Sequence, residues 1–226
     1  MTAALTVISS MATRKLLGEL IDKLAGAPVT VESVGGVDAA RRVAAGEVFD
    51  AVVLGADAID RLIADGQVRA GSRVDLVRSG VALAVKAGAP RPDIGSAQAV
   101  RAAVLAARTV GCSTGPSGVA LARLFDHWGI AEQVQARLVV PPPGTPVGAL
   151  IARGEVELGF QQLSELMFLP GIDVLGPLPE PIQITTVFAG GVPTASRQPQ
   201  AAQALLERLA APDLTAIKRA NGMDSA

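Results

Sequence analysis

A duplication within the chain constrains its fold more than any other feature of the sequence. Residues 36–54 and 144–162 share one pattern: a loop glycine, a short helix-like stretch, the tripeptide Gly-Glu-Val and an apolar run. The offset is the same 108 positions at the loop glycines and at both tripeptides. A serine-containing turn stands upstream of each copy, at Ser9-Ser10 and at Ser113. Each half therefore predicts strand, turn, helix, strand, turn, helix and strand, the pattern of a parallel α/β lobe.

Apolar periodicity predicts the remaining elements and the domain boundaries. Strands are expected at residues 5–8, 29–34, 51–54, 109–111, 135–140 and 158–161. Helices are expected at residues 13–24, 38–45, 57–64 (capped by Asp57), 97–107 (capped by Ser96), 117–128, 146–153, 199–210 and 213–221. Two extended segments, 73–87 (interrupted at Ser79-Gly80) and 182–192, are expected to cross between lobes. They define lobe 1 as residues 1–78 plus 188–226 and lobe 2 as residues 79–187, joined by a two-strand hinge.

Composition narrows the classes of function. Half of the residues are hydrophobic, enough for two cores, whereas only 3% are aromatic and Tyr is absent. A net charge of −1, from 20 Lys plus Arg against 21 Asp plus Glu, argues against nucleic acid or an anionic membrane as partner. One Cys and one His exclude a disulfide framework and a Cys/His zinc cluster. We therefore expect no metal site and no cofactor, and we expect a monomer.

The chain carries no signal for membrane insertion. No uninterrupted apolar run reaches the roughly 20 residues that a membrane span needs. The first four residues lead directly into a strand, without the basic, apolar and cleavage regions of a signal peptide. This favours a cytoplasmic location for the sequence as it stands, and a periplasmic one if a signal peptide has been removed.

Four predicted helix N-termini occupy equivalent places in the duplication and are candidates for holding an anion. Open α/β sheets bind ligands at the carboxyl ends of their strands, and helix N-termini there present unpaired N–H groups. About four to six such donors, at roughly 1.5–3 kcal/mol per bond to a charged acceptor, support roughly micromolar affinity. The candidate ligand-binding residues are Ser9, Ser10, Gly36, Val37, Ser113, Thr114, Ser117, Thr145 and Val147. The alternatives are plain helix N-caps for the serines and turns of positive φ for the glycines.

The Gln-Gln-Leu-Ser-Glu turn at residues 161–165 closes the second copy. The amides of Gln161 and Gln162 can donate to an anion and accept from a hydroxyl, which makes both candidate ligand contacts. The alternative is a solvated turn with Ser164 as a helix N-cap. The turn at residues 113–118 matches neither a P-loop nor a Gly-x-Ser-x-Gly elbow, and it has no histidine base within reach.

Four motifs spread over the chain carry a resemblance to a known family. They are Ser9-Ser10 after the opening strand, A-A-G-E-x-x-D-A-V-V at 44–53, G-S-R-V-D-L-V-R-S-G at 71–80 and L-I-A-R-G-E-V-E-L-G at 150–159. With these motifs the chain resembles the molybdate-binding branch of the type II periplasmic solute-binding proteins. The resemblance implies two Rossmann-like α/β lobes with a hinge, Ser10 as a hydroxyl contact to an oxyanion, and Ser117 and Val147 as backbone donors. Gly35-Gly36-Val37 stands where that branch has a second serine, and the tyrosine of the branch has no counterpart here.

The Gln-Gln-Leu-Ser-Glu turn is similar to a side branch of the same superfamily, whose scaffold is also that of aconitate isomerase. The main interpretation is reversible capture of a small anion, oxyanion or carboxylate, between the lobes, with an ABC permease as candidate partner. The alternative is an isomerase of a small polycarboxylate, in which Glu165 would be the base that moves an allylic proton. A cytoplasmic ligand sensor, recognised by a partner protein in its closed form, is a third hypothesis.

Overall fold

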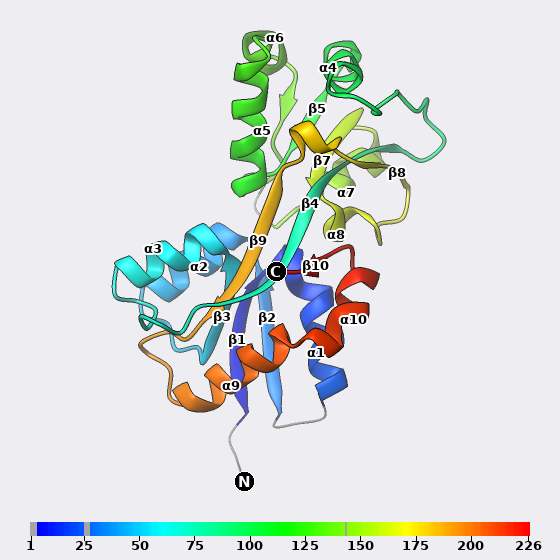
Figure 1. The fold of residues 1–226 in the computed structure, drawn as a ribbon. Helices are drawn as coiled ribbons and strands as arrows, with labels where there is room; N and C mark the ends of the chain where they lie inside the picture. Colours follow the sequence, from blue (N-terminus) through cyan, green and yellow to red (C-terminus); the bar gives the residue numbers. More distant parts are fainter. Residues whose placement is uncertain (1–3, 25–27, 143) are drawn as a thin grey trace. The chain divides into compact units, whose positions relative to one another are not determined.

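The chain folds into two compact α/β units, which a computed structural model describes for residues 4–24, 28–142 and 144–226. Unit 1 comprises Met1–Ser79 and Thr186–Ala226, and unit 2 comprises Gly80–Thr185. Two strands, β4 (Val74–Lys86) and β9 (Thr185–Gly191), carry the chain from one unit to the other (Figure 1). The predicted α/β fold class is confirmed. Within the described ranges, no helix has the length and apolar character needed to cross a membrane.

Unit 1 has a sheet in the order β2-β1-β3-β9, in which β2, β1 and β3 are parallel and β9 is antiparallel to β3; β10 pairs antiparallel with β4. Besides β4 and β9, the elements of unit 1 are β1 (Leu5–Ser10), η1 (Met11–Thr13), α1 (Arg14–Leu24), β2 (Val29–Val34), α2 (Gly36–Ala44), β3 (Ala51–Gly55), α3 (Ala56–Ala64), α9 (Pro199–Ala210), η3 (Pro212–Leu214), α10 (Thr215–Ala220) and β10 (Asp224–Ser225). Successive strand residues point to opposite faces. Val7 therefore packs with α1 and α9, and Ile8 packs with α2 and α3 on the other face (Figure 1).

Unit 2 is a sheet in the order β6-β5-β7-β4, with β8 also paired to β4. Its elements are α4 (Ala97–Ala106), β5 (Val110–Cys112), α5 (Pro116–His127), α6 (Ala131–Gln135), β6 (Leu138–Val139), α7 (Val147–Arg153), β7 (Leu158–Gln162), α8 (Leu163–Leu166), β8 (Ile172–Pro177) and η2 (Glu180–Ile182). β5, β6 and β7 are parallel, and β4 is antiparallel to β7. Leu83 of β4 packs with α4 and α5, whereas Ala84 packs with α7 and α8.

The duplication seen in the sequence is a duplication of structure. The run β1-α1-β2-α2-β3 of unit 1 corresponds to β5-α5-β6-α7-β7 of unit 2. In both units the first strand lies between the other two, and all three are parallel. Because parallel strands end at one edge of a sheet, the turns after β1 and β2 share an edge in unit 1. The turns after β5, β6 and β7 likewise share an edge in unit 2.

The predicted interruption at Ser79-Gly80 is wrong, because β4 is one continuous strand through both residues. Gly80 is there for a packing reason: a Cβ at this position would lie 3.0 Å from Nε2 of Gln183. Val81 then donates to Oε1 of the same glutamine at 3.0 Å. The glycine therefore makes room for the Gln183 amide beside the strand.

Other local predictions also need correction. Residues 135–140 were expected as one strand, whereas the chain forms the short helix α6 and the two-residue strand β6. The N-cap of α3 is Gly55, so Asp57 lies in the first turn and is not the cap. Strand β8 was not predicted. Ser96 does cap α4, because its side chain accepts a hydrogen bond from Ala99 N at 3.1 Å.

Candidate functional site

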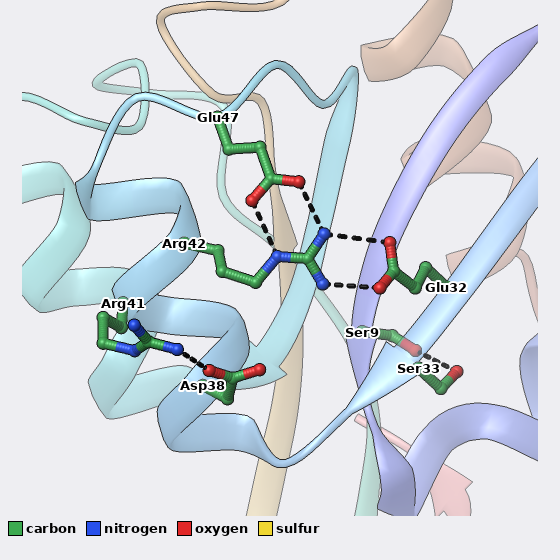
Figure 2. Close-up of polar contacts among 7 residues, drawn as sticks. All are labelled: Ser9, Glu32, Ser33, Asp38, Arg41, Arg42 and Glu47. Atoms are coloured by element: carbon green, nitrogen blue, oxygen red, sulfur yellow. Dashed lines mark hydrogen bonds and ion pairs between the residues drawn. The ribbon is translucent and has the colours of Figure 1, made fainter.

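Three serines lie at the carboxyl ends of β1 and β2 in unit 1. Ser9 is paired with Ser33 across the two parallel strands, and their Oγ atoms are 2.8 Å apart (Figure 2). Ser9 Oγ also donates to Ser10 O at 3.3 Å. Ser10 is the N-cap of η1 but makes no side-chain cap bond, and its buried Oγ has no partner among the residues that the structure describes. Of the predicted pair, Ser10 is therefore the hydroxyl with hydrogen-bonding capacity left.

The N-terminus of α2 lies beside Ser10. A Cβ added at Gly36 would lie 3.6 Å from Ser10 Cβ. The first N–H groups of a helix, here those of Gly36 and Val37, have no acceptor within the helix and carry the positive end of its dipole. The Val37 side chain is 67% exposed. Gly36 is not one of the glycines with positive φ, whereas Gly144 is, at φ 80°. Unit 1 thus combines a buried hydroxyl with a helix N-terminus.

Ion pairs hold α2 against the edge strand β2. Arg42 of α2 donates from Nη2 to Glu32 Oε2 at 3.0 Å and from Nε to Glu47 Oε2 at 2.7 Å (Figure 2). These bonds from the Arg42 guanidinium hold the pKa of Glu32 and of Glu47 below the usual range. Arg41 pairs with Asp38 in the first turn of the same helix. The pairs orient α2 and therefore its N-terminal donors.

In unit 2, the turn after β5 brings Ser113 and Ser117 together at the start of α5. Their Oγ atoms are 3.1 Å apart. The N-cap of α5 is Gly115, so Ser117 lies inside the first turn and the N-cap alternative is wrong for it. A Cβ at Gly118 would overlap the Ser113 carbonyl oxygen, so the turn closes directly onto the helix. Thr114 is exposed at the tip.

The turn before α7 supplies backbone groups. Thr145 is half-buried, and its N–H donates to Pro142 O at 3.1 Å. Val147 is the first residue of α7, and its side chain is fully buried. Its backbone N–H is therefore the only group that it can offer a ligand. The next N–H, that of Gly148, is already taken by Gln161 Oε1 at 3.3 Å.

Gln161 and Glu165 are the polar residues next to the start of α7, where Gln161 bonds to Gly148. Gln161 is 3% exposed, and its Nε2 donates to Glu165 Oε1 at 2.9 Å. Burial raises the pKa of Glu165 from 4.5 to about 7, and the hydrogen bond from Gln161 opposes that rise. At neutral pH this carboxyl can both accept and release a proton, which is what acid–base catalysis requires.

The rest of the turn is also polar and buried. Gln162, the last residue of β7, is 4% exposed and is the N-cap of α8. Ser164 is therefore not the cap, and its buried Oγ has no hydrogen-bond partner within the described part of the chain. The sequence did not indicate Ser33 or Gly148 as site residues, and it indicated Ser164 only as a helix N-cap. Only Ser33 had a usable signal, because parallel pairing of the first two strands sets it beside Ser9.

Two other features bear on the chemistry. Arg14 lines an open groove of about 420 Å³ in unit 1, together with Gly18, Val31, Glu32 and Ser33. Cys112 is buried, and burial raises the pKa of its thiol, so it is a poor nucleophile. The described residues contain no group of three or more His, Cys, Asp or Glu side chains suited to a metal ion. Unit 1 thus offers hydroxyl and N–H donors for an anion, and unit 2 offers such donors together with one carboxyl for proton transfer.

Comparisons with known proteins find relatives in both sequence and structure. Over 220 residues, 92% of this chain and 83% of its relative, the sequence is 40% identical to an aconitate isomerase of a Pseudomonas species. The periplasmic molybdate-binding protein of Azotobacter vinelandii has a similar structure, with a TM-score of 0.80 at 19% identity over 97% of this chain and 98% of that one. The sulfate-binding protein of Mycobacterium tuberculosis gives 0.77 at 16% identity over 98% of this chain and 86% of that one.

The solved structures share the fold at low sequence identity, whereas a family model identifies the chain by its sequence. The model described as bacterial extracellular solute-binding protein matches residues 5–224, nearly the whole chain. The chain therefore belongs to the family of bacterial extracellular solute-binding proteins, with the type II fold of the molybdate-binding proteins.

Proposed function

We propose that this protein isomerises a small polycarboxylate, and that aconitate is the first substrate to test. The observation that carries the proposal is the 40% identity with an aconitate isomerase over 92% of the chain. The chemistry of unit 2 supports it, because Glu165 is a carboxyl that titrates near neutral pH. A protein that only captures an anion has no need of such a group.

Aconitate is a propene that carries three carboxylates, and its isomerisation moves the double bond by one carbon. A base removes a proton from the methylene carbon, and the electron pair spreads over the double bond and the adjoining carboxylate. The proton then returns to the carbon at the other end of the allylic system. No atom is gained or lost, and the base ends the cycle as a carboxylate. Glu165 is the residue to which we assign both proton transfers.

The raised pKa of Glu165 suits this role. An ordinary carboxylate, with its pKa of 4.5, is a weak base toward a carbon acid, and efficiency improves as the pKa approaches the working pH. With a pKa of about 7, roughly half of the Glu165 side chains are ionised at pH 7. The residue can therefore start the reaction as a base and finish it as an acid.

The substrate carboxylates need donors, and the chain offers them without a lysine. In unit 2, which carries Glu165, we assign this role to the Ser113–Ser117 pair at the start of α5. In unit 1, Ser10 with the N–H groups of Gly36 and Val37 offers donors of the same kind. Each hydrogen bond to a carboxylate contributes roughly 1.5–3 kcal/mol. Three or four of them would support roughly micromolar affinity after the cost of association.

The test is proton NMR of cis- and trans-aconitate incubated separately with the protein in deuterium oxide. We expect each isomer to give the other, with deuterium entering the carbons that exchange protons. Glu165→Gln should lower the rate at least about a hundredfold, the usual contribution of a general base. Glu155→Gln is the matched control, because Glu155 is an exposed glutamate of unit 2 paired with Arg153. Equal turnover by Glu165→Gln and wild type would contradict the assignment of the base.

A second candidate function is capture of the anion without turnover, with delivery to an ABC permease. The Ser10 hydroxyl beside α2 favours it, because that hydroxyl has no partner among the described residues and, like the helix N–H groups, can bind an anion but does no chemistry. Calorimetric titration with molybdate, sulfate, citrate and aconitate separates the two functions. Tight binding of one anion with no deuterium exchange into aconitate would favour capture and reject the isomerase.

A further inference from the structure

We propose that Gln161 is a positioning residue, which fixes the orientation of the Glu165 carboxylate and does not itself contact the ligand. The inference rests on the proposed function for its catalytic meaning, because it assumes that Glu165 transfers the proton. The contact geometry behind it stands independently of any reaction.

Both ends of the Gln161 amide are occupied by protein groups of opposite hydrogen-bonding character. Oε1 accepts from the N–H of Gly148 at 3.3 Å, and Nε2 donates to Glu165 Oε1 at 2.9 Å. A flipped amide would set its NH₂ group against an N–H and its oxygen against a carboxylate. The backbone donor therefore dictates which end of the amide faces Glu165.

The backbone donor is itself held in place. A Cβ at Gly148 would overlap Leu169 and would lie 3.3 Å from Leu166 Cδ2, so α7 packs closely on α8 and the residues that follow it. Gln161 extends from β7, which lies between β5 and β4 and is paired on both sides. The amide is thus anchored to the sheet at its Cα and to α7 at its oxygen, so only its Nε2 faces Glu165.

This arrangement has two consequences for the carboxyl group. Gln161 engages Oε1, which leaves Oε2 as the oxygen that exchanges a proton with a substrate. The same bond favours the ionised form and so opposes the rise of the Glu165 pKa caused by burial. Gln161 therefore keeps this half-buried carboxyl ionised for part of the time at neutral pH, which a base requires.

The test measures the ionisation of Glu165 directly, by carbon-13 NMR of glutamate carboxyl groups over a pH series in protein without ligand. The Glu165 signal is assigned by its loss in Glu165→Gln. Gln161→Met keeps the length of the side chain and removes the donor. We expect it to raise the Glu165 midpoint by roughly 1–2 pH units, because a bond to a charged group is lost. Gln161→Asn, which is one methylene too short to span both partners, should raise it as well and serves if the methionine variant does not fold.

The matched control is Gln183→Met. Gln183 is another amide held at both ends within unit 2: Oε1 accepts from Val81 N at 3.0 Å, and Nε2 donates to Leu178 O at 3.1 Å. It touches no carboxylate in these bonds, so the variant should lower thermal stability and leave the Glu165 midpoint unchanged. A purely structural role for Gln161 would make the two variants behave alike.

The outcomes separate this inference from the proposed function. An unchanged midpoint in folded Gln161→Met or Gln161→Asn overturns the positioning role, whether or not the wild type turns over aconitate. A raised midpoint supports it, even if no turnover is seen and the isomerase proposal fails. If the wild type is active, the acidic limb of its pH–rate profile should move upward in Gln161→Met by the same amount as the midpoint.

Discussion

Replacing Glu165 with glutamine is expected to change how the stability of unit 2 depends on pH. The folded pKa of Glu165 is about 7, whereas the ordinary value is 4.5. At pH values between 4.5 and about 7, Glu165 of the folded protein keeps a proton that the unfolded chain releases. Stability therefore falls as pH rises through this window, and the loss is complete above the folded pKa.

The size of the effect follows from the pKa shift. One pKa unit corresponds to about 1.4 kcal/mol, so a shift of about 2.5 units corresponds to roughly 3 kcal/mol. Glutamine cannot ionise and does not suffer this loss. Relative to the wild type, Glu165→Gln should therefore gain up to about 3 kcal/mol of stability between pH 4.5 and pH 8.

Urea unfolding at a series of pH values and constant ionic strength measures this difference. The single tryptophan, Trp128, lies in unit 2 and reports the unfolding of that unit by fluorescence. Glu157→Gln is the control of opposite sign, because the backbone N–H and side chain of Arg108 lower the pKa of Glu157. The stability of Glu157→Gln relative to the wild type should fall as pH rises above the folded pKa of Glu157. Parallel curves for wild type and Glu165→Gln would refute the reasoning, since they would mean that this carboxyl titrates normally.

Four further substitutions have clear expected outcomes. Ser10→Ala should weaken the binding of a polycarboxylate by roughly tenfold to a hundredfold in calorimetry, with little change in melting temperature, because its hydroxyl has no protein partner among the described residues. Gly118→Ala should lower the free energy of unfolding by more than about 3 kcal/mol, because the new Cβ overlaps a backbone oxygen. Gly18→Ala, where a Cβ meets nothing within 4 Å, should raise it by about 0.5–1 kcal/mol. Lys218→Ala should cost at least about 2 kcal/mol in urea unfolding, because the fully buried Nζ donates to two backbone carbonyls at 3.1 Å.

Much of the fold could be predicted because the strands of this chain are short apolar runs between glycine- or serine-containing turns. Residues 29–34 were predicted as a strand, and the structure has the same bounds. The failure at residues 135–140 has a physical cause. Helix α6 has five residues and β6 has two, so neither is long enough for its periodicity to show. Strand β8 contains Gly176 and ends at Pro177, residues that usually indicate a loop.

The candidate site was harder to predict, because the role of a polar residue depends on partners that are distant in sequence. Ser9 and Ser10 are equivalent in the sequence, yet the Ser9 hydroxyl bonds to the Ser33 hydroxyl, whereas the Ser10 hydroxyl has no partner among the described residues. Gln161 was expected to contact a ligand. That contact stays a prediction, and what the structure adds is a bond from its amide to Gly148, 13 residues earlier in the chain. No local pattern indicates such a bond, because it depends on how closely α7 packs against the residues around it.

The order of the two units along the chain has a consequence for how the protein is made. Unit 2 is one uninterrupted segment whose ends are joined, since Val81 N donates to Ile184 O at 3.0 Å. Unit 1 is split, and its helices α9 and α10 come from the last part of the chain. On the ribosome unit 2 can therefore complete its core while unit 1 still lacks α9 and α10. We expect the unit that begins first to finish last, and the interval between the two to be when nascent chains most need a chaperone.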